Sequence, residues 1–200
     1  MASIFVSIFK LKSFNIIDTF KKRIIDNFNK FSTSFFSCPK AEVTALMTLL
    51  TGTLRKEIQS LNKNNVRFTT IGNISKFPSK VKKEISESIE MTKSNSGLNL
   101  ILALNYGGKQ EILNATNEII KDVENGIISP NEIDETIFNQ KLYTNNIPDP
   151  DLLIRTGGDF RISNFMLWQL AYTELHFTSS FWPDFNNDEL MDVINEFNSR

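Results

Sequence analysis

The first half of the chain alternates between helix-like and strand-like spacing of its apolar residues. Short apolar runs predict strands at residues 66–71 and 98–104. Helical spacing predicts helices at residues 79–93 and 109–125. A further amphipathic helix is predicted at residues 41–62, where the inward stripe is Val43, Leu46, Met47, Leu50, Leu54, Ile58 and Leu61. Such a stripe most simply packs into a protein core.

The second half carries explicit helix-start signals. Ser129, Pro130 and Glu132 combine a capping serine, a first-turn proline and a reciprocating glutamate, which predict a short helix before Leu142. Residues 186–189 predict the start of the last helix in a similar way.

Between these helices, residues 151–185 predict a strand, a turn, a helix and a second strand. Apolar runs mark the strands at residues 152–154 and 175–178. The glycine pair at residues 157–158 predicts a tight turn with exposed backbone amides. Ser163 is then expected to cap a helix over residues 164–172.

Strands that alternate with helices are typical of βαβ units. Such units build an α/β fold with a mostly parallel sheet flanked by helices, whose ligands bind beyond the carboxyl ends of the strands. Arg155 and Gly107 both fall at such strand ends. We therefore expect the functional site at this edge of the sheet.

Composition and charge narrow the class of protein. A chain of 200 residues with 40% hydrophobic residues can bury the core of one domain, and a net charge of −1 argues against a nucleic-acid-binding surface. The single cysteine, Cys38, allows no internal disulfide and is expected to be a buried thiol in a reducing compartment. The apolar residues 2–9 are too few to span a bilayer. These features predict a cytoplasmic protein.

The beginning of the chain differs from the rest. Residues 1–30 are predicted to form a divergent helical leader, and residues 31–200 the main domain. Within the leader, apolar residues at helical spacing lie beside basic residues, and such a helix could rest on a membrane surface. These residues are Ile17, Phe20, Lys21, Lys22, Arg23 and Ile24. Asp18 and Asp26 interrupt the basic face, which favours a helix that packs on protein or an unrelated leader.

The candidate chemistry is phosphate binding. The guanidiniums of Arg155 and Arg161 can each form paired, charge-assisted hydrogen bonds with phosphate oxygens, and two such forks suit a diphosphate. Glu174 can hold magnesium beside bound phosphates through one or two oxygens. For each of these charged side chains considered alone, surface ion pairing is the alternative interpretation. His176, the only histidine, is interpreted as packing rather than as a catalyst.

Four segments of the chain carry longer motifs: IGNISKFP, LALNYGGKQEI, LYTNNIPDP and DLLIRTGGDFRISNFMLWQLAYTELHFTSSFWPDF. Together they resemble one enzyme family, the cis-prenyltransferases or undecaprenyl diphosphate synthases, over about residues 31–200. The resemblance implies a compact α/β fold, a homodimer and a requirement for Mg²⁺. It also implies condensation of isopentenyl diphosphate with an allylic diphosphate such as farnesyl diphosphate, in which each addition forms a cis double bond. The helix over residues 41–62 would then also help to line a tunnel for the growing hydrocarbon.

The family's functional residues carry over to named positions of this chain. Arg155, Arg161 and Ser163 match its isopentenyl diphosphate ligands, and Glu174 matches its carboxylate on magnesium. Three nearby positions differ, because Asp159, Lys109 and His176 replace the family's glutamate, arginine and tyrosine.

The family's N-terminal catalytic motif is not found. Members carry a segment D-G-N-G-R-W, whose aspartate is the principal catalytic and metal-binding group, and this chain offers only the faint similarity of residues 26–31, DNFNKF. The next family motif, F-S-T-E-N-W, is replaced by FSTSFF at residues 31–36. The chain also stops at Arg200, short of the usual tail, so the domain is expected to be incomplete at both ends and its catalytic residue is unassigned.

Three functional hypotheses follow. The first is an isoprenyl transferase that makes a cis-polyprenyl diphosphate. The second is a catalytically silent subunit that binds isopentenyl diphosphate or dimerises with a complete synthase. The third is a truncated product without independent function.

Overall fold

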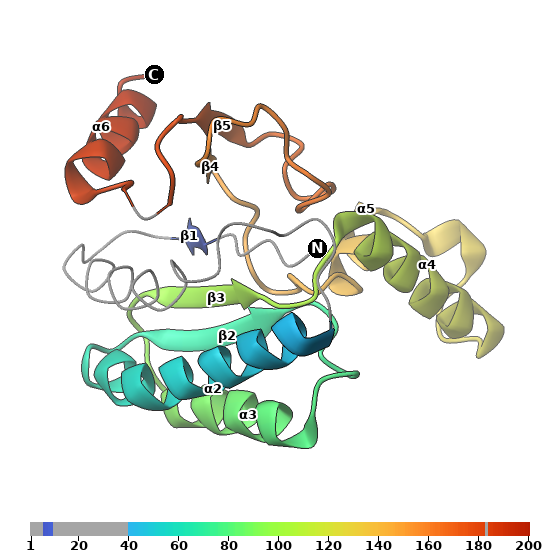
Figure 1. Cartoon of the computed structure of the whole chain (residues 1–200). Helices are drawn as coiled ribbons and strands as arrows, with labels where there is room; N and C mark the ends of the chain where they lie inside the picture. The colour runs from blue at the N-terminus through green and yellow to red at the C-terminus, as the bar shows by residue number, and fades with distance from the viewer. Residues whose placement is uncertain (1–5, 10–39, 183) are drawn as a thin grey trace.

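The computed structural model describes residues 6–9, 40–182 and 184–200 of the chain, and side-chain positions from residue 50 onward with the same gap. Figure 1 shows helices around two small sheets. The elements in chain order are β1 Val6–Phe9, α2 Lys40–Lys63, β2 Arg67–Ile71, α3 Ser79–Thr92, β3 Asn99–Ala103, α4 Gly108–Glu124, the 3-10 helix η2 Pro130–Glu132, α5 Glu135–Gln140, β4 Leu152–Arg155, β5 Glu174–Phe177 and α6 Asn187–Asn198.

The first sheet has the strand order β1-β3-β2. Strands β2 and β3 are parallel, with Arg67 opposite Asn99 and Ile71 opposite Ala103, whereas β1 joins the free edge of β3 in the antiparallel sense. Strands β4 and β5 form a second, parallel pair. Parallel strand pairs flanked by helices confirm the predicted α/β fold.

Strand β1 lies inside the segment for which a helical leader was predicted. The four residues Val6–Phe9 are extended. The helical rhythm that suggested a leader helix, residues 17–31, lies outside the described residues, as does Cys38. A membrane-surface role for that segment therefore stays a prediction. Within the described part of the chain, no helix combines the length and the apolar character needed to cross a bilayer.

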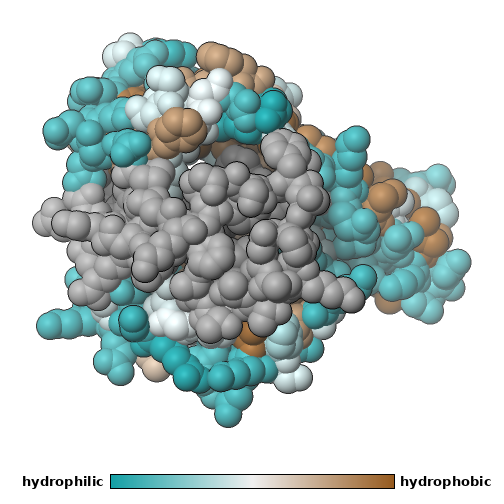
Figure 2. Space-filling view, viewed as in Figure 1, coloured by the Kyte–Doolittle hydropathy of each residue, from teal (hydrophilic) through white to brown (hydrophobic). Residues whose placement is uncertain are grey.

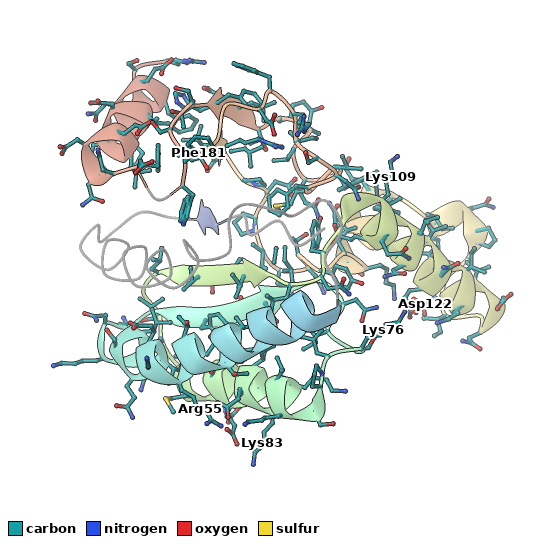
Figure 3. All side chains as sticks on the ribbon, viewed as in Figure 1. Arg55, Lys76, Lys83, Lys109, Asp122 and Phe181 are labelled. Carbon is teal, nitrogen blue, oxygen red and sulfur yellow. The ribbon has the colours of Figure 1, made fainter. Side chains whose placement is uncertain are left out.

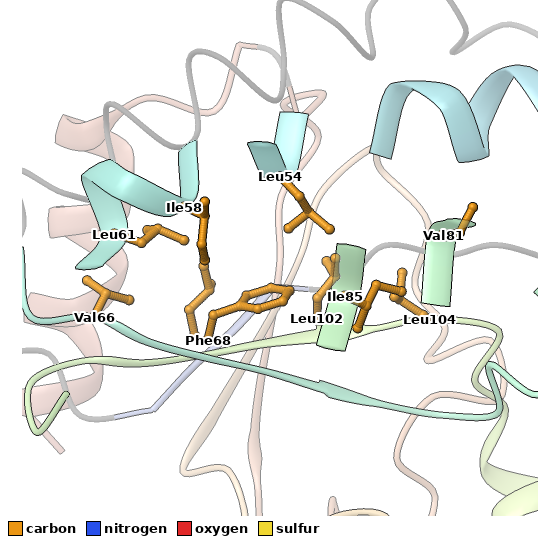
Figure 4. Close-up of a cluster of buried hydrophobic side chains, with 10 residues drawn as sticks. Leu54, Ile58, Leu61, Val66, Phe68, Val81, Ile85, Leu102 and Leu104 are labelled. Carbon is orange, nitrogen blue, oxygen red and sulfur yellow. The ribbon is translucent and has the colours of Figure 1, made fainter. Parts of the chain in front are cut away.

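Strand β3 is buried on both faces, and its residues alternate between two clusters. Leu100, Leu102 and Leu104 join the cluster under α2 and α3, where Phe68 of β2 lies at its centre with no exposed surface. Helices α2 and α3 contribute Leu54, Ile58, Leu61, Val81 and Ile85 to that cluster, and Val66 joins it from the residue before β2 (Figure 4). The described part of the α2 stripe therefore packs against protein, as its spacing predicted.

The opposite face of the first sheet receives the C-terminal half of the chain. Ile101 and Ala103 of β3 meet Leu153 of β4 together with Phe165 and Met166. Because alternate residues of a strand point to opposite faces, this contact follows from the same short run that builds the first cluster. Strands β4 and β5 and helix α6 accordingly lie on the side away from α2 and α3 (Figure 1).

Helices α4 and α5 project to one side of the molecule (Figure 1). An ion pair between Lys141, after α5, and Asp122 of α4 ties the two helices together; Asp122 is labelled in Figure 3. Figure 2 shows apolar residues among polar ones on this projection. The exposed apolar side chains of α4 include Leu113 and Ile120, which are seven positions apart and share one face.

The caps form at two of the predicted helix starts. Asn186 caps α6 by accepting a hydrogen bond from the Glu189 amide at 3.0 Å, as expected. The capping box at Ser129 also forms, but it caps only the 3-10 helix η2, and α5 begins separately at its own cap, Asp134.

Candidate functional site

Arg155 is the last residue of β4, and the strand register fixes where its side chain starts. It lies opposite Phe177 of β5, at the carboxyl end of this parallel pair. Residues opposite one another in a parallel pair point to the same face of the sheet. The guanidinium of Arg155 is nearly buried, with 12% of its side chain exposed.

Arg155 gathers the other candidate residues around its guanidinium. Its Nη1 donates to Ser163 Oγ at 2.8 Å and also to the carbonyl oxygen of Arg161, while its Nη2 donates to Asp159 Oδ2 at 2.9 Å. Arg161 binds the same two side chains, because its Nη2 donates to Asp159 Oδ2 at 2.6 Å and its Nε to Ser163 Oγ at 3.2 Å. The structure thus brings Arg155, Arg161 and Ser163 together.

The two arginines are not equally open to a ligand. The hydrogen bonds described above occupy three of the five N–H donors of Arg155 and two of those of Arg161. The side chain of Arg161 is also far more exposed, at 56%. Arg161 is therefore the more accessible donor, and Arg155 is the buried charge around which the loop is organised.

Electrostatics favour an anion at this point. Two guanidiniums share one carboxylate, that of Asp159, so the cluster carries a formal charge of about +1. The remaining N–H groups of two planar forks suit the oxygens of a phosphate or diphosphate. Asp159 occupies both arginines in the way that a bound anion would.

The glycine turn does not supply the amides that the sequence predicted for a ligand. Gly157 and Gly158 adopt positive φ angles of 92° and 77°, as a tight turn requires. Their amides, however, donate to the carbonyl oxygens of Ser180 and Thr178, both at 2.9 Å. The prediction of exposed amides was wrong because the turn extends the pairing between β4 and the chain after β5.

The helix predicted for residues 164–172 is absent, and this segment consists of turns. Ser163, Asn164 and Met166 have φ angles of 47°, 64° and 45°, in the left-handed region, and a right-handed helix cannot continue through such residues. Asn164 instead binds the start of α4, where its carbonyl accepts from the Gly108 amide at 2.7 Å and its Oδ1 from the Lys109 amide at 2.9 Å.

Glycine is needed where this loop meets α4. A Cβ on Gly108 would lie 2.8 Å from Cγ and 2.9 Å from the backbone nitrogen of Leu167, so no larger residue fits without moving the loop. Lys109, which follows it, lies where α4 meets the C-terminal half (Figure 3). The close approach therefore couples the position of Ser163 to the first turn of α4.

Glu174 lies away from this cluster. It is the first residue of β5 and pairs with Leu152, three positions before Arg155 on β4, a separation along the strands of about 10 Å. Its Oε2 accepts from Arg200 Nη1 at 3.1 Å. The structure therefore does not bring Glu174 to the two arginines, and its role as a magnesium ligand stays a prediction.

His176, two residues along β5 from Glu174, faces a carboxylate rather than the arginine cluster. Its Nδ1 lies 3.8 Å from Oε2 of Glu196 on α6. Glu196 also pairs with Arg200 at 2.6 Å. The interpretation of His176 as a packing residue stays a prediction.

Among the described residues, no group of three or more histidine, cysteine, aspartate or glutamate side chains could hold a metal ion. Magnesium commonly binds one or two carboxylates and completes its shell with water and substrate phosphates. Asp159 and Glu174 each offer one carboxylate, and arginine already engages both. The donor set of these residues therefore fits magnesium only with phosphate oxygens present.

Sequence reasoning missed the buried polar residues behind the site. Glu111 and Gln169 each have 1% of their surface exposed, and they are hydrogen-bonded to one another at 3.0 Å. Tyr106 also donates to Glu111, and burial is the main cause that raises the pKa of Tyr106 far above its usual value. The available signal was Glu111 in the first turn of an otherwise apolar inward face, beside the glycine pair at the start of α4.

Comparisons with known proteins agree with the fold and the motifs. The chain matches a family model described as "Putative undecaprenyl diphosphate synthase" over residues 17–200, a match that begins inside the predicted leader. The isoprenyl transferase of Clostridium perfringens is 46% identical over 85% of this chain and 67% of its own length. The ditrans,polycis-undecaprenyl-diphosphate synthase of Micrococcus luteus is also 46% identical, over 85% of this chain and 68% of its own.

Solved structures give the same result. A lavandulyl diphosphate synthase from Lavandula x intermedia, in complex with dimethylallyl diphosphate, aligns with a TM-score of 0.78 at 39% identity over 82% of this chain and 72% of that chain. A probable undecaprenyl diphosphate synthase from Campylobacter jejuni aligns with a TM-score of 0.74 at 28% identity, over 95% of this chain and 92% of that chain.

Proposed function

The chain belongs to the undecaprenyl diphosphate synthase family of cis-prenyltransferases, and from this we propose that it condenses isopentenyl diphosphate with an allylic diphosphate such as farnesyl diphosphate. The product is a cis-polyprenyl diphosphate. The observation that carries the proposal is the convergence of Arg155, Arg161 and Ser163 at the carboxyl end of β4. This is where ligands bind in open α/β sheets.

In the proposed reaction the cluster binds the diphosphate of isopentenyl diphosphate. Arg161 offers its free N–H groups to phosphate oxygens, Arg155 contributes a fixed positive charge, and Ser163 supplies a hydroxyl. Holding the diphosphate in one place orients the double bond of the attached isopentenyl group toward the allylic carbon. The allylic carbon–oxygen bond breaks with its electron pair leaving on the diphosphate, the double bond attacks that carbon, and a proton is lost.

Magnesium belongs to the proposal because the family resemblance implies it, with Glu174 as the matching carboxylate. When bound, the metal would neutralise charge on diphosphate oxygens. A single carboxylate that completes the metal's shell with phosphate oxygens supports this assignment. The ion pair with Arg200 and the separation from Arg155 count against Glu174 acting together with Arg155 on one phosphate.

We also propose that the chain dimerises, either with itself or with a complete synthase. The resemblance to the family supports a homodimer, and Leu113 and Ile120 are two exposed apolar side chains on one face of the projecting helix α4 that a partner could cover. Light scattering coupled to size exclusion tests the homodimer. A mass of one chain for the purified protein contradicts it.

The second candidate function is a catalytically silent subunit that binds isopentenyl diphosphate. The sequence feature that favours it is FSTSFF at residues 31–36, where the family's F-S-T-E-N-W motif has an asparagine and a tryptophan. In this case the arginine cluster works as a binding site, and a complete synthase partner supplies the chemistry.

One assay separates the two functions. The purified chain is incubated with magnesium, farnesyl diphosphate and radiolabelled isopentenyl diphosphate, with a complete synthase as positive control, and polyprenyl products are extracted. Product from this chain alone supports the transferase. Binding of isopentenyl diphosphate without product, while the control works, supports the silent subunit.

A further inference from the structure

Glu111 is a buried carboxylate that the proposed reaction does not use. It lies in the first turn of α4 with 1% of its surface exposed. Its Oε1 accepts from the Tyr143 amide at 2.9 Å, and its Oε2 accepts from the hydroxyl of Tyr106 and from Gln169 Nε2 at 3.0 Å. All three groups are hydrogen-bond donors, and all three reach this one side chain in the protein interior.

The three donors come from separate stretches of chain. Tyr106 precedes α4, Tyr143 follows α5, and Gln169 lies in the turns after Ser163. Gln169 is itself buried and donates a second hydrogen bond from Nε2 to Thr144 Oγ1 at 3.0 Å. Glu111 is thus the shared acceptor that joins the beginning of α4 to two segments without regular secondary structure.

Aromatic packing follows the same connections. The ring of Tyr106 meets the ring of Phe165 edge to face at a centroid distance of 5.5 Å, and the ring of Tyr143 at 6.2 Å. Phe165 belongs to the core cluster on the far face of the first sheet. A shift of Tyr106 or Gln169 would therefore move the chain on both sides of Phe165.

The segment over residues 161–169 depends on such tertiary contacts. It has no helix and no strand ladder, and three of its residues have left-handed backbone angles. Two of its polar anchors end on the first turn of α4: Asn164, which binds the amides of Gly108 and Lys109, and Gln169, which binds Glu111. The segment is also held by Arg155, which binds Ser163 and the carbonyl of Arg161, and by Trp168, whose Nε1 donates to Asn139 Oδ1 at 2.7 Å. Ser163 directly precedes the anchor Asn164, and Arg161 lies three residues before it.

We propose that Glu111 is a positioning residue, which fixes Ser163 and Arg161 in the diphosphate site by holding Gln169 and Tyr106 against the first turn of α4. The expected effect of Glu111 on the affinity for diphosphate rests on the proposed function. The fixing of the loop itself is a property of the chain without ligand. Each part has its own measurement.

The first measurement is hydrogen exchange of the ligand-free chain. Glu111→Gln keeps the shape of the side chain but replaces one acceptor oxygen with an N–H₂ group. This group cannot accept a hydrogen bond from the donor that faces it. The matched control is Glu118→Gln, the same change two turns along α4 at an exposed residue that pairs only with Lys121. We expect faster exchange in residues 161–169 of Glu111→Gln and no change in α3.

Equal exchange of residues 161–169 in Glu111→Gln and in the control overturns the proposal. Thr144→Val is the milder second variant, because it removes only the outer partner of Gln169 while keeping the volume of the side chain. It should show the same change at smaller amplitude. It therefore keeps the test decisive if Glu111→Gln does not fold.

The second measurement is a double-mutant cycle on the affinity for isopentenyl diphosphate, titrated by calorimetry. Glu111→Gln should weaken binding by about fivefold, which corresponds to the loss of one ordinary hydrogen bond in the site. If Glu111 acts through Ser163, then Ser163→Ala should weaken binding less in the Glu111→Gln background than in the original chain. A residue that only stabilises the fold gives additive effects.

The two failures are distinguishable. If the original chain does not bind isopentenyl diphosphate, the proposed function is wrong, while the exchange experiment still decides whether Glu111 fixes the loop. If the original chain binds and the two substitutions are additive, the positioning role is wrong and the diphosphate site stands.

Discussion

Asp159→Asn is the change for which the structure makes the most specific prediction. Asp159 Oδ2 lies 2.9 Å from Arg155 Nη2 and 2.6 Å from Arg161 Nη2, on the two guanidiniums that a phosphate would bind. A phosphate oxygen bound to the same guanidiniums would lie within about 5 Å of this carboxylate. Asp159 therefore both holds the arginines together and repels an incoming anion.

The size of each effect can be estimated. Two unit charges about 5 Å apart interact by about 1–3 kcal/mol for effective dielectric constants between about 80 and 20. Because Asp159 and Arg161 are well exposed, at 43% and 56%, solvent screening favours the lower end. We expect Asp159→Asn to tighten isopentenyl diphosphate binding by about 1 kcal/mol, or about fivefold. Loss of the exposed ion pairs should reduce the free energy of unfolding by about 0.5–1 kcal/mol.

The assay is calorimetric titration with isopentenyl diphosphate in the presence of a chelator, so that any role of a carboxylate toward magnesium does not contribute. Asp151→Asn is the matched control, because Asp151 is exposed just before the other end of β4 and the charge change is the same. If Asp159→Asn weakens binding, or changes it no more than the control, then Asp159 does not compete with the ligand and the reasoning is refuted.

Three further predictions concern the core, the acid stability and the metal. Phe68→Ala should lower the free energy of unfolding by about 3–5 kcal/mol in urea denaturation, because Phe68 is fully buried at the centre of its cluster; a loss below about 1 kcal/mol contradicts this packing. The hydrogen bond from Arg55 is the main cause that lowers the pKa of Glu84, so its stabilisation is present above the usual carboxyl pKa and is lost as pH falls through the lowered one. Arg55→Ala should therefore flatten the decline of the urea midpoint below about pH 4, and an unchanged acid profile refutes the pairing. Glu174→Gln should reduce the magnesium dependence of isopentenyl diphosphate binding if Glu174 holds the metal, and equal dependence in both chains removes that assignment.

The fold was predictable wherever a local pattern determines burial. The described part of the helical stripe of α2 and the short apolar run of β3 are buried in the structure, as their patterns predicted. The last helix was equally predictable, because a cap such as Asn186 acts within a few residues.

The sequence predicted which residues form the site but not the backbone conformation that holds them. The motif gave Arg155, Arg161 and Ser163, and the structure brings them together. The same motif predicted a helix after Ser163, which tertiary bonds from Asn164 to the start of α4 prevent. The hydrogen bond between Asn164 and the Lys109 amide joins residues 55 positions apart. The periodicity of a short sequence window carries no information about such a contact.

Glu174 illustrates a second limit. It lies close to the arginines in the motif, yet the parallel register places it at the other end of the strand pair. Sequence distance gives no register, because register depends on how the connecting segment packs. The buried acceptor Glu111 was missed for a related reason, since its three donors come from three separate segments.

The most direct test of the central claim is the affinity of Arg161→Ala for isopentenyl diphosphate. Arg161 is the exposed donor of the cluster, and loss of its charge-assisted bonds should weaken binding by about 1.5–3 kcal/mol, or about 10- to 100-fold. Arg67→Ala, which removes an exposed arginine at the start of β2, should bind like the original chain. Equal affinity of Arg161→Ala and the original chain would contradict the assignment of this cluster as the diphosphate site.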